Sequence, residues 1–120
     1  MQEYLLLIRT EGNPWEMLSP EQLQKHVEKA ADYIGRLVRE EKLKGAQPLD
    51  WEGKIISNTA GTWKDGPYNE SKEVIAGYFL VLAKDIEEAT QLARANPIFE
   101  DGLKARIEVR PVKTVEGINR

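Results

Sequence analysis

The sequence predicts an α+β fold, because segments with helical periodicity alternate with apolar segments typical of strands. Apolar residues recur at helical spacing after Ser19 and again after Asp85. Continuous or alternating apolar segments lie at residues 4–8, 73–83 and 105–112. The chain has 120 residues, of which 41% are hydrophobic and 31% charged, and this suits one globular domain.

The first half of the chain predicts one strand followed by a long helix. Residues 4–8 form an unbroken apolar run, which favours a strand covered on both faces. Ser19 can cap a helix, Pro20 suits its first position, and Gln22 completes a capping box. We expect this helix to run from about residue 20 to 43, with Gly45 just beyond its end.

The second half predicts further strands around a shorter helix. Residues 54–57 resemble a strand, and Asp65-Gly66-Pro67 has the composition of a turn. Residues 73–83 form the clearest strand of the chain. Asp85 begins a helix that ends before Pro97, and residues 105–112 then alternate between apolar and charged side chains.

The resulting order is β-α-β-β-α-β, with room for an extra short hairpin between residues 46 and 64. This is the order of the ferredoxin-like fold, with an antiparallel sheet. We expect a single domain over residues 1–120, in which the polar residues 113–120 form a flexible tail.

Composition excludes several classes of site. The chain contains no cysteine, so it has no disulfide, no thiolate metal site and no cysteine nucleophile. Its net charge is -3, which disfavours nucleic acid as a partner. The glycines match neither the dinucleotide-binding pattern nor the phosphate loop, and no cofactor is expected. The apolar run at the start is too short for a signal or transmembrane segment, so we expect a cytoplasmic protein without a membrane partner.

A nine-residue motif carries a resemblance to a known family. The motif is Asp65-Gly66-Pro67-Tyr68-Asn69-Glu70-Ser71-Lys72-Glu73. It is followed by Gly77-Tyr78-Phe79 in the next strand and by Glu108-Val109-Arg110-Pro111-Val112 near the end, and Trp15 precedes Leu18-Ser19-Pro20-Glu21 upstream. In this combination the chain resembles the DGPF branch of the YCII-related family over roughly residues 3–112.

The resemblance implies a ferredoxin-like fold that dimerises into an α+β barrel, and it implies little about activity. Related YCII-type members carry a suspected catalytic histidine three residues before a Tyr-Leu pair. Tyr33-Ile34 looks like that pair, which puts Ala30 at the position of the histidine, whereas His26 lies one turn earlier. Some DGPF relatives are associated with sigma factors, which implies a regulatory role. Some YCII-type relatives are thought to act on chlorinated aromatics.

Three residues are candidates for catalysis. His26 is the only histidine and could act as a base, but a partly exposed structural histidine is the favoured interpretation, and a metal site is less favoured still. Asp65 could act on a substrate, although we favour a role in bonding the backbone of its own turn. Arg110 could hold a carboxylate ligand, although ion pairs across neighbouring strands are the favoured role for the charged residues Glu73, Glu108 and Arg110.

Aromatic and charged residues are the candidates for ligand binding. Trp15, Trp63 and Tyr68 could line a pocket for a flat ligand or pack in the core or an interface. The complete set of ligand-binding candidates is Trp15, Trp63, Asp65, Tyr68, Glu73, Tyr78 and Arg110. We expect the pocket between the sheet and its helices or near a dimer seam, close to residues 63–73.

A homodimer is expected because the strand at 73–83 is apolar on both faces, while two helices can cover only one face of the sheet. Two functions remain open. The chain is either a homodimeric small-ligand-binding or regulatory domain, or a cofactor-free enzyme of lyase or isomerase type acting on a small molecule, aromatic or not. The first is slightly favoured because the suspected family histidine is absent. His26, Asp65 or Arg110 pointing into a cavity together with another titratable group would favour the second.

Overall fold

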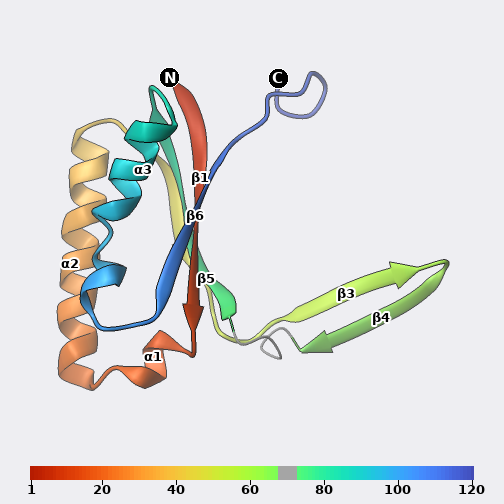
Figure 1. Cartoon of the computed structure of the whole chain (residues 1–120), viewed down its shortest axis with the longest axis horizontal. Coiled ribbons are helices and arrows are strands. Elements are labelled where there is room, and N and C mark those ends of the chain that lie inside the picture. The colour runs from red at the N-terminus through yellow and green to blue at the C-terminus, as the bar shows by residue number, and fades with distance from the viewer. Residues whose placement is uncertain (68–72) are drawn as a thin grey trace.

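The computed structural model describes residues 1–67 and 73–120, which form a two-layer α+β structure with a projecting hairpin (Figure 1). Four strands form an antiparallel sheet in the order β2-β5-β1-β6. They span Gln2–Glu11 (β1), Leu43–Pro48 (β2), Glu73–Ala83 (β5) and Ala105–Pro111 (β6). This strand order, with helices after β1 and β5, is that of the ferredoxin-like fold, so the predicted fold class is confirmed.

The helices cover one face of this sheet. They are the single turn α1 (Pro14–Met17), the long helix α2 (Pro20–Arg39), α3 (Ile86–Arg94) and the 3-10 turn η2 (Pro97–Glu100). Along β1 the residues Tyr4, Leu6 and Ile8 are buried beneath the helices, and the alternation of strand side chains turns Leu5 and Leu7 to the opposite face. No helix in the described part of the chain is long and apolar enough to cross a membrane.

The sheet face turned away from the helices is called the open face. It carries half-buried side chains of the two central strands, namely Leu5, Leu7, Tyr78, Leu80 and Leu82. The register brings Leu5 opposite Leu80 and Leu7 opposite Tyr78. Apolar side chains therefore lie on both faces of β1 and β5, as the sequence predicted.

Helix α2 begins as predicted but ends early. The Ser19 hydroxyl accepts from the N–H of Gln22, and the Gln22 side chain accepts from the N–H of Ser19. The helix ends at Arg39 rather than near residue 43. Glu41 adopts a φ of 58°, and the N–H of Lys42 then donates to the Leu37 carbonyl at 2.9 Å. The predicted helix end is wrong because Glu41 adopts the left-handed conformation that glycine usually adopts after a helix. Gly45, the glycine expected there, lies inside β2.

A β-hairpin, here called the arm, comprises β3 (Lys54–Thr59) and β4 (Thr62–Pro67) and projects away from the body (Figure 1). The predicted strand at 54–57 is confirmed, but it pairs only within the arm. The predicted turn at residues 65–67 is wrong, because these residues lie in β4. The chain turns instead at Ala60 and Gly61, whose φ values are 50° and 86°. Two adjacent positive φ values suit the twist of a two-residue hairpin loop, so the reversal occurs there.

The remaining predicted elements agree with the structure. The Asp85 side chain accepts from the N–H of Glu88 and caps α3, and β6 occupies the alternating segment near the end. In residues 113–120, which the sequence led us to expect as a flexible tail, the Asn119 amide donates to the Lys113 carbonyl at 2.9 Å. Tyr68 and the rest of residues 68–72 lie outside the described part of the chain.

Candidate functional site

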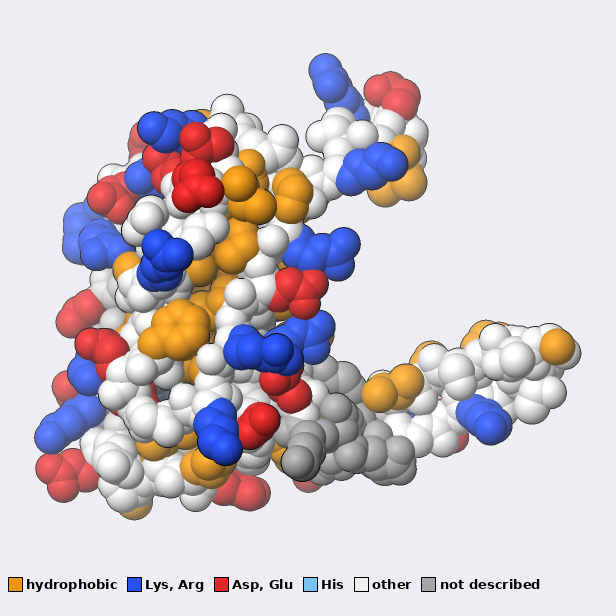
Figure 2. All heavy atoms as spheres, in the orientation of Figure 1, with side chains coloured by type: hydrophobic (Ala, Val, Ile, Leu, Met, Phe, Trp, Pro, Cys, Tyr) orange, Lys and Arg blue, Asp and Glu red, His pale blue; other side chains and the backbone are white. Residues whose placement is uncertain are grey.

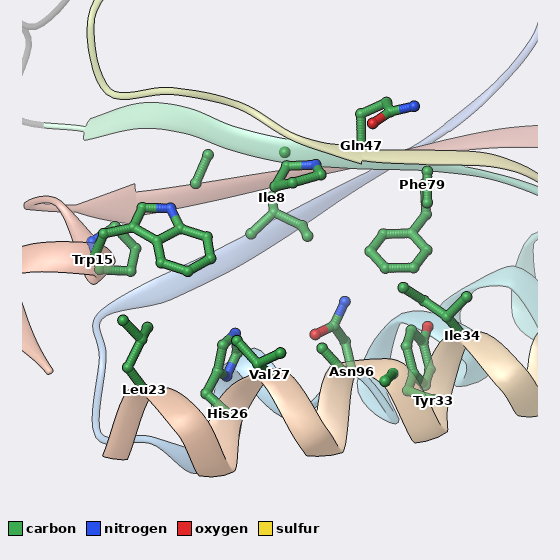
Figure 3. A pocket seen from close by; sticks show the side chains of 17 residues that line it. Ile8, Trp15, Leu23, His26, Val27, Tyr33, Ile34, Gln47, Phe79 and Asn96 are labelled. Carbon is green, nitrogen blue, oxygen red and sulfur yellow. The ribbon is translucent and has the colours of Figure 1, made fainter. Parts of the chain in front are cut away.

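A pocket of about 320 Å³ lies between α2 and the sheet (Figure 3). Helix α2 presents one face to it because its apolar residues recur at helical spacing, and the opposite wall comes from β1, β2 and β5. The lining side chains include Ile8, Trp15, Leu23, Val27, Ile34 and Phe79. Trp15 lies at one end of the pocket, and Tyr33 and Phe79 lie at the other.

The lining is almost wholly apolar. Among the described residues that line it there is no lysine, arginine, aspartate or glutamate, and the titratable side chains are those of His26 and Tyr33. A charged ligand would lose its hydration there without gaining an opposite charge from the lining, so the pocket suits an uncharged molecule. Trp15 and Phe79 give two aromatic surfaces to such a ligand.

His26 is the polar group of most chemical interest. Its Nδ1 lies 2.5 Å from Oδ2 of Asp101, and the two side chains are only 15% and 11% exposed. A carboxylate can only accept, so a neutral His26 carries its proton on Nδ1 and leaves a lone pair on Nε2. No described residue forms a hydrogen bond with Nε2. The arrangement therefore holds an oriented base in the wall of the pocket, supported by a carboxylate that can stabilise the protonated ring.

Tyr33 also lines the pocket, but its hydroxyl is used within the fold. The hydroxyl donates to the Leu92 carbonyl at 2.6 Å, and the ring meets Phe79 edge to face at a centroid distance of 5.4 Å. Burial raises the pKa of Tyr33 to about 12, while the positive charge of Arg36 acts in the opposite direction. Tyr33 is thus neutral at physiological pH and serves packing rather than proton transfer.

Two further polar residues line the pocket, and neither offers a titratable group. Oδ1 of the buried Asn96 accepts from the N–H of Ile98 at 2.9 Å, which caps η2. The side chain of Gln47 points away from the cavity (Figure 3). His26 is therefore the side chain through which the pocket can exchange a proton.

The structure distributes the sequence-derived candidates over several places. His26 and Trp15 line the pocket. Asp65 and Trp63 are exposed on the arm. Tyr78 lies on the open face. Tyr68 lies outside the described residues. The pocket lies between the sheet and helix α2, which is one of the two positions expected from the sequence. Of the described lining residues, Ala76 and Gly77 are nearest in sequence to the expected segment 63–73.

The charged candidates form ion pairs outside the pocket. Arg106 grips Glu73 with two hydrogen bonds of 2.7 and 3.1 Å, and this grip lowers the pKa of the Glu73 carboxyl. Arg110 is 67% exposed and lies 3.5 Å from Glu108 of its own strand. Glu108 also pairs at 3.1 Å with Arg9 of the neighbouring strand.

Asp101 and Asn96 were missed by sequence reasoning. Asp101 lies 75 residues from His26 along the chain, and only the packing of η2 beside α2 brings the two side chains together. No local motif marks Asp101, which reads as part of a polar loop before Gly102. In the described part of the chain, no group of three or more His, Asp or Glu side chains is placed to hold a metal ion.

Comparison with known proteins agrees with this architecture. A search of curated proteins finds no match to the chain. The family model of the YCII-related domain matches residues 3–113, which is nearly the whole chain and includes every element of the sheet, the helical layer and the arm. The chain belongs to the YCII-related domain family.

Proposed function

We propose that the chain is a cofactor-free enzyme of lyase or isomerase type, in which His26 transfers a proton to or from a small, uncharged, aromatic molecule. The observation that supports this proposal is the pair formed by His26 and Asp101 at the wall of an otherwise apolar pocket. A base oriented by a carboxylate and shielded from water is the common arrangement for proton abstraction.

The chemistry requires no further reactant. Nε2 of His26 takes a proton from the bound molecule, and Asp101 stabilises the resulting positive ring at 2.5 Å. An isomerisation ends when His26 returns the proton to another atom of the same molecule. A lyase reaction ends when the electrons left behind expel a leaving group that takes up the proton. The pocket volume of about 320 Å³ is near the lower limit for ligand sites, so the substrate is small.

A second candidate function is a small-ligand-binding or regulatory domain. It is favoured because the other polar groups of the pocket already form hydrogen bonds within the fold. The Tyr33 hydroxyl donates to the Leu92 carbonyl, and Oδ1 of Asn96 accepts from the N–H of Ile98. Shape and one hydrogen bond accepted by Nε2 of His26 suffice for binding, whereas many enzymes use a second titratable group. Both functions require that the pocket accept an uncharged aromatic molecule.

Proton exchange separates the two functions. Phenol and benzoate serve as matched probes that differ in charge. We expect phenol but not benzoate to perturb the fluorescence of a variant with Trp51→Phe and Trp63→Phe, in which Trp15 is the single tryptophan. A panel of uncharged aromatic carbon acids that bind is then incubated in D2O. The enzyme proposal expects deuterium to enter a bound molecule, and His26→Ala should slow this at least about 100-fold while changing its dissociation constant little.

The matched control is His26→Gln, which keeps a hydrogen-bonding side chain but no base, and it should lose exchange as fully as His26→Ala. Ligands that bind without any exchange above the buffer rate would contradict the enzyme proposal and leave the binding domain. If no uncharged aromatic molecule binds, both functions are wrong for this pocket.

We also propose that the chain belongs to the DGPF branch of its family, which the motif from residue 65 to 73 supports. We further propose that the protein is a homodimer formed through the open face. The support for the dimer is the apolar surface of Leu5, Leu80 and Leu82, which no helix covers. Light scattering should give twice the chain mass of 13.7 kDa at micromolar concentration. Leu80→Arg should give the single-chain mass, and a wild-type monomer would contradict the proposal.

A further inference from the structure

The chain exposes more surface than a compact protein of its mass. Its accessible surface is 8420 Å². A folded monomer of 13.7 kDa exposes about 6600 Å². The radius of gyration is 16.2 Å, against about 14 Å for a compact domain of this length. The excess of roughly 1800 Å² is enough to supply one side of a large protein interface.

The arm is one source of this exposed surface. Its described side chains are exposed, and they include the large apolar residues Ile55 (53% exposed), Ile56 (70%) and Trp63 (71%). Asn58 pairs with Trp63 and Ile56 with Asp65, so Ile56 and Trp63 share one face of the hairpin as diagonal neighbours. A lone two-stranded hairpin is marginally stable in water. One face of the arm therefore carries two large exposed apolar side chains, Ile56 and Trp63, beside the polar Asn58 and Asp65, and the apolar pair needs a surface to pack on.

The position of the arm indicates which surface this is. The arm extends on the side of the open face, away from the helices, and appears as a thin projection with apolar side chains along it (Figures 1 and 2). A second copy packed on the open face would place its sheet about 10 Å away. Six residues of strand span about 20 Å, so the arm reaches past that second sheet to the layer behind it.

We infer that the arm of each protomer packs against the second copy, so that the dimer is held by two exchanged hairpins as well as by the open faces. A two-fold axis makes the exchange reciprocal, because the arm of each copy contacts the same surface of the other copy. The apolar side chains of Ile56 and Trp63 are then buried, and the excess surface of each chain is accounted for by its partner. This inference rests on the proposed homodimer.

Trp63 provides the direct test. The variant with Trp15→Phe and Trp51→Phe keeps Trp63 as its single tryptophan. At concentrations where light scattering gives a dimer, we expect blue-shifted emission and several-fold slower quenching by acrylamide than for free tryptophan amide. On dilution to the monomer, emission and quenching should return to the values of an exposed indole, since Trp63 is 71% exposed in the single chain.

Three outcomes would overturn the inference, and they separate it from the dimer proposal. If the dimer forms but acrylamide quenches Trp63 as fast as free tryptophan amide, the proposed open-face dimer remains and the arm takes no part in it. A protected Trp63 in a monomer shows that the arm packs on its own chain. A monomer with an exposed Trp63 at every concentration contradicts both proposals.

A substitution tests the same contact by affinity. Trp63→Ser should weaken dimerisation about tenfold or more, because buried tryptophans carry much of the energy of interfaces. Val38→Ser is the matched control, since Val38 is 57% exposed on α2, away from the arm and the open face, and it should leave the dimer constant unchanged. Equal dimer constants for wild type and Trp63→Ser would overturn the inference. Thermal melting of both variants checks that the domain itself is intact.

Discussion

Tyr33→Phe removes one buried oxygen and keeps the ring. In the wild type the hydroxyl donates to the Leu92 carbonyl at 2.6 Å, and Tyr33 is 6% exposed. The substitution leaves that carbonyl without its partner but preserves the edge-to-face contact with Phe79. At neutral pH the expected loss is about 1 to 3 kcal/mol of unfolding free energy, which is the cost of one unpaired buried acceptor.

The same hydroxyl makes stability depend on alkaline pH. Burial raises the pKa of folded Tyr33 to about 12, from an ordinary value of 10. The folded state therefore keeps a proton that the unfolded chain loses between pH 10 and 12. The stability contributed by this proton is complete below pH 10 and is lost as the pH rises toward 12, at about 1 kcal/mol for the first unit above 10.

Urea unfolding followed by circular dichroism measures both effects. Between pH 8 and pH 11 the stability difference between wild type and Tyr33→Phe should shrink by about 1 kcal/mol, because phenylalanine has no proton to lose. Tyr78→Phe, on the open face, controls for the removal of one phenol. If the difference between wild type and Tyr33→Phe is the same at both pH values, the folded state does not hold this proton, and the role given to burial at Tyr33 is wrong.

Two backbone positions yield further predictions, both measured by the same denaturation assay. Gly77→Ala should lower the free energy of unfolding by about 1 to 3 kcal/mol, because its Cβ would lie 2.9 Å from the Gln47 carbonyl oxygen. Gly45→Ala is the control and should be nearly neutral, because its Cβ would have nothing within 4 Å. Equal losses for the two variants would contradict the argument. Glu41→Gly should add about 0.5 to 1 kcal/mol, because glycine adopts a φ of 58° without strain, whereas Glu40→Gly, where φ is -85°, should stabilise nothing.

Local chemistry predicted most of the fold. The Ser19 cap, the Asp85 cap and the two-faced apolar strand at 73–83 each depend on neighbours within a few residues, and each was predicted correctly. The errors occurred where two local preferences competed. Glu41 adopts a positive φ that is usually found at glycine, so the helix ends before it. Residues 43–48 then form a strand. Asp65-Gly66-Pro67 has turn composition but is held in β4 by pairing with β3.

The candidate site was less predictable, because it depends on tertiary packing. His26 was identified as a candidate base because it is the only histidine of the chain, but its partner Asp101 was not identified. A carboxylate after a 3-10 turn carries no signal that it will meet a histidine in another helix. Trp63 and Trp15 are also alike as sequence, yet one lies on the arm and the other lines the pocket.

Helix α2 is fastened at two points across the helical layer. His26 ties its first half to Asp101, and Tyr33 ties its second half to Leu92. Helix α2 therefore cannot move separately from the rest of the helical layer unless both bonds break together. We therefore expect small molecules to enter and leave at the end of the pocket that Trp15 occupies, where the single turn α1 joins β1 to α2.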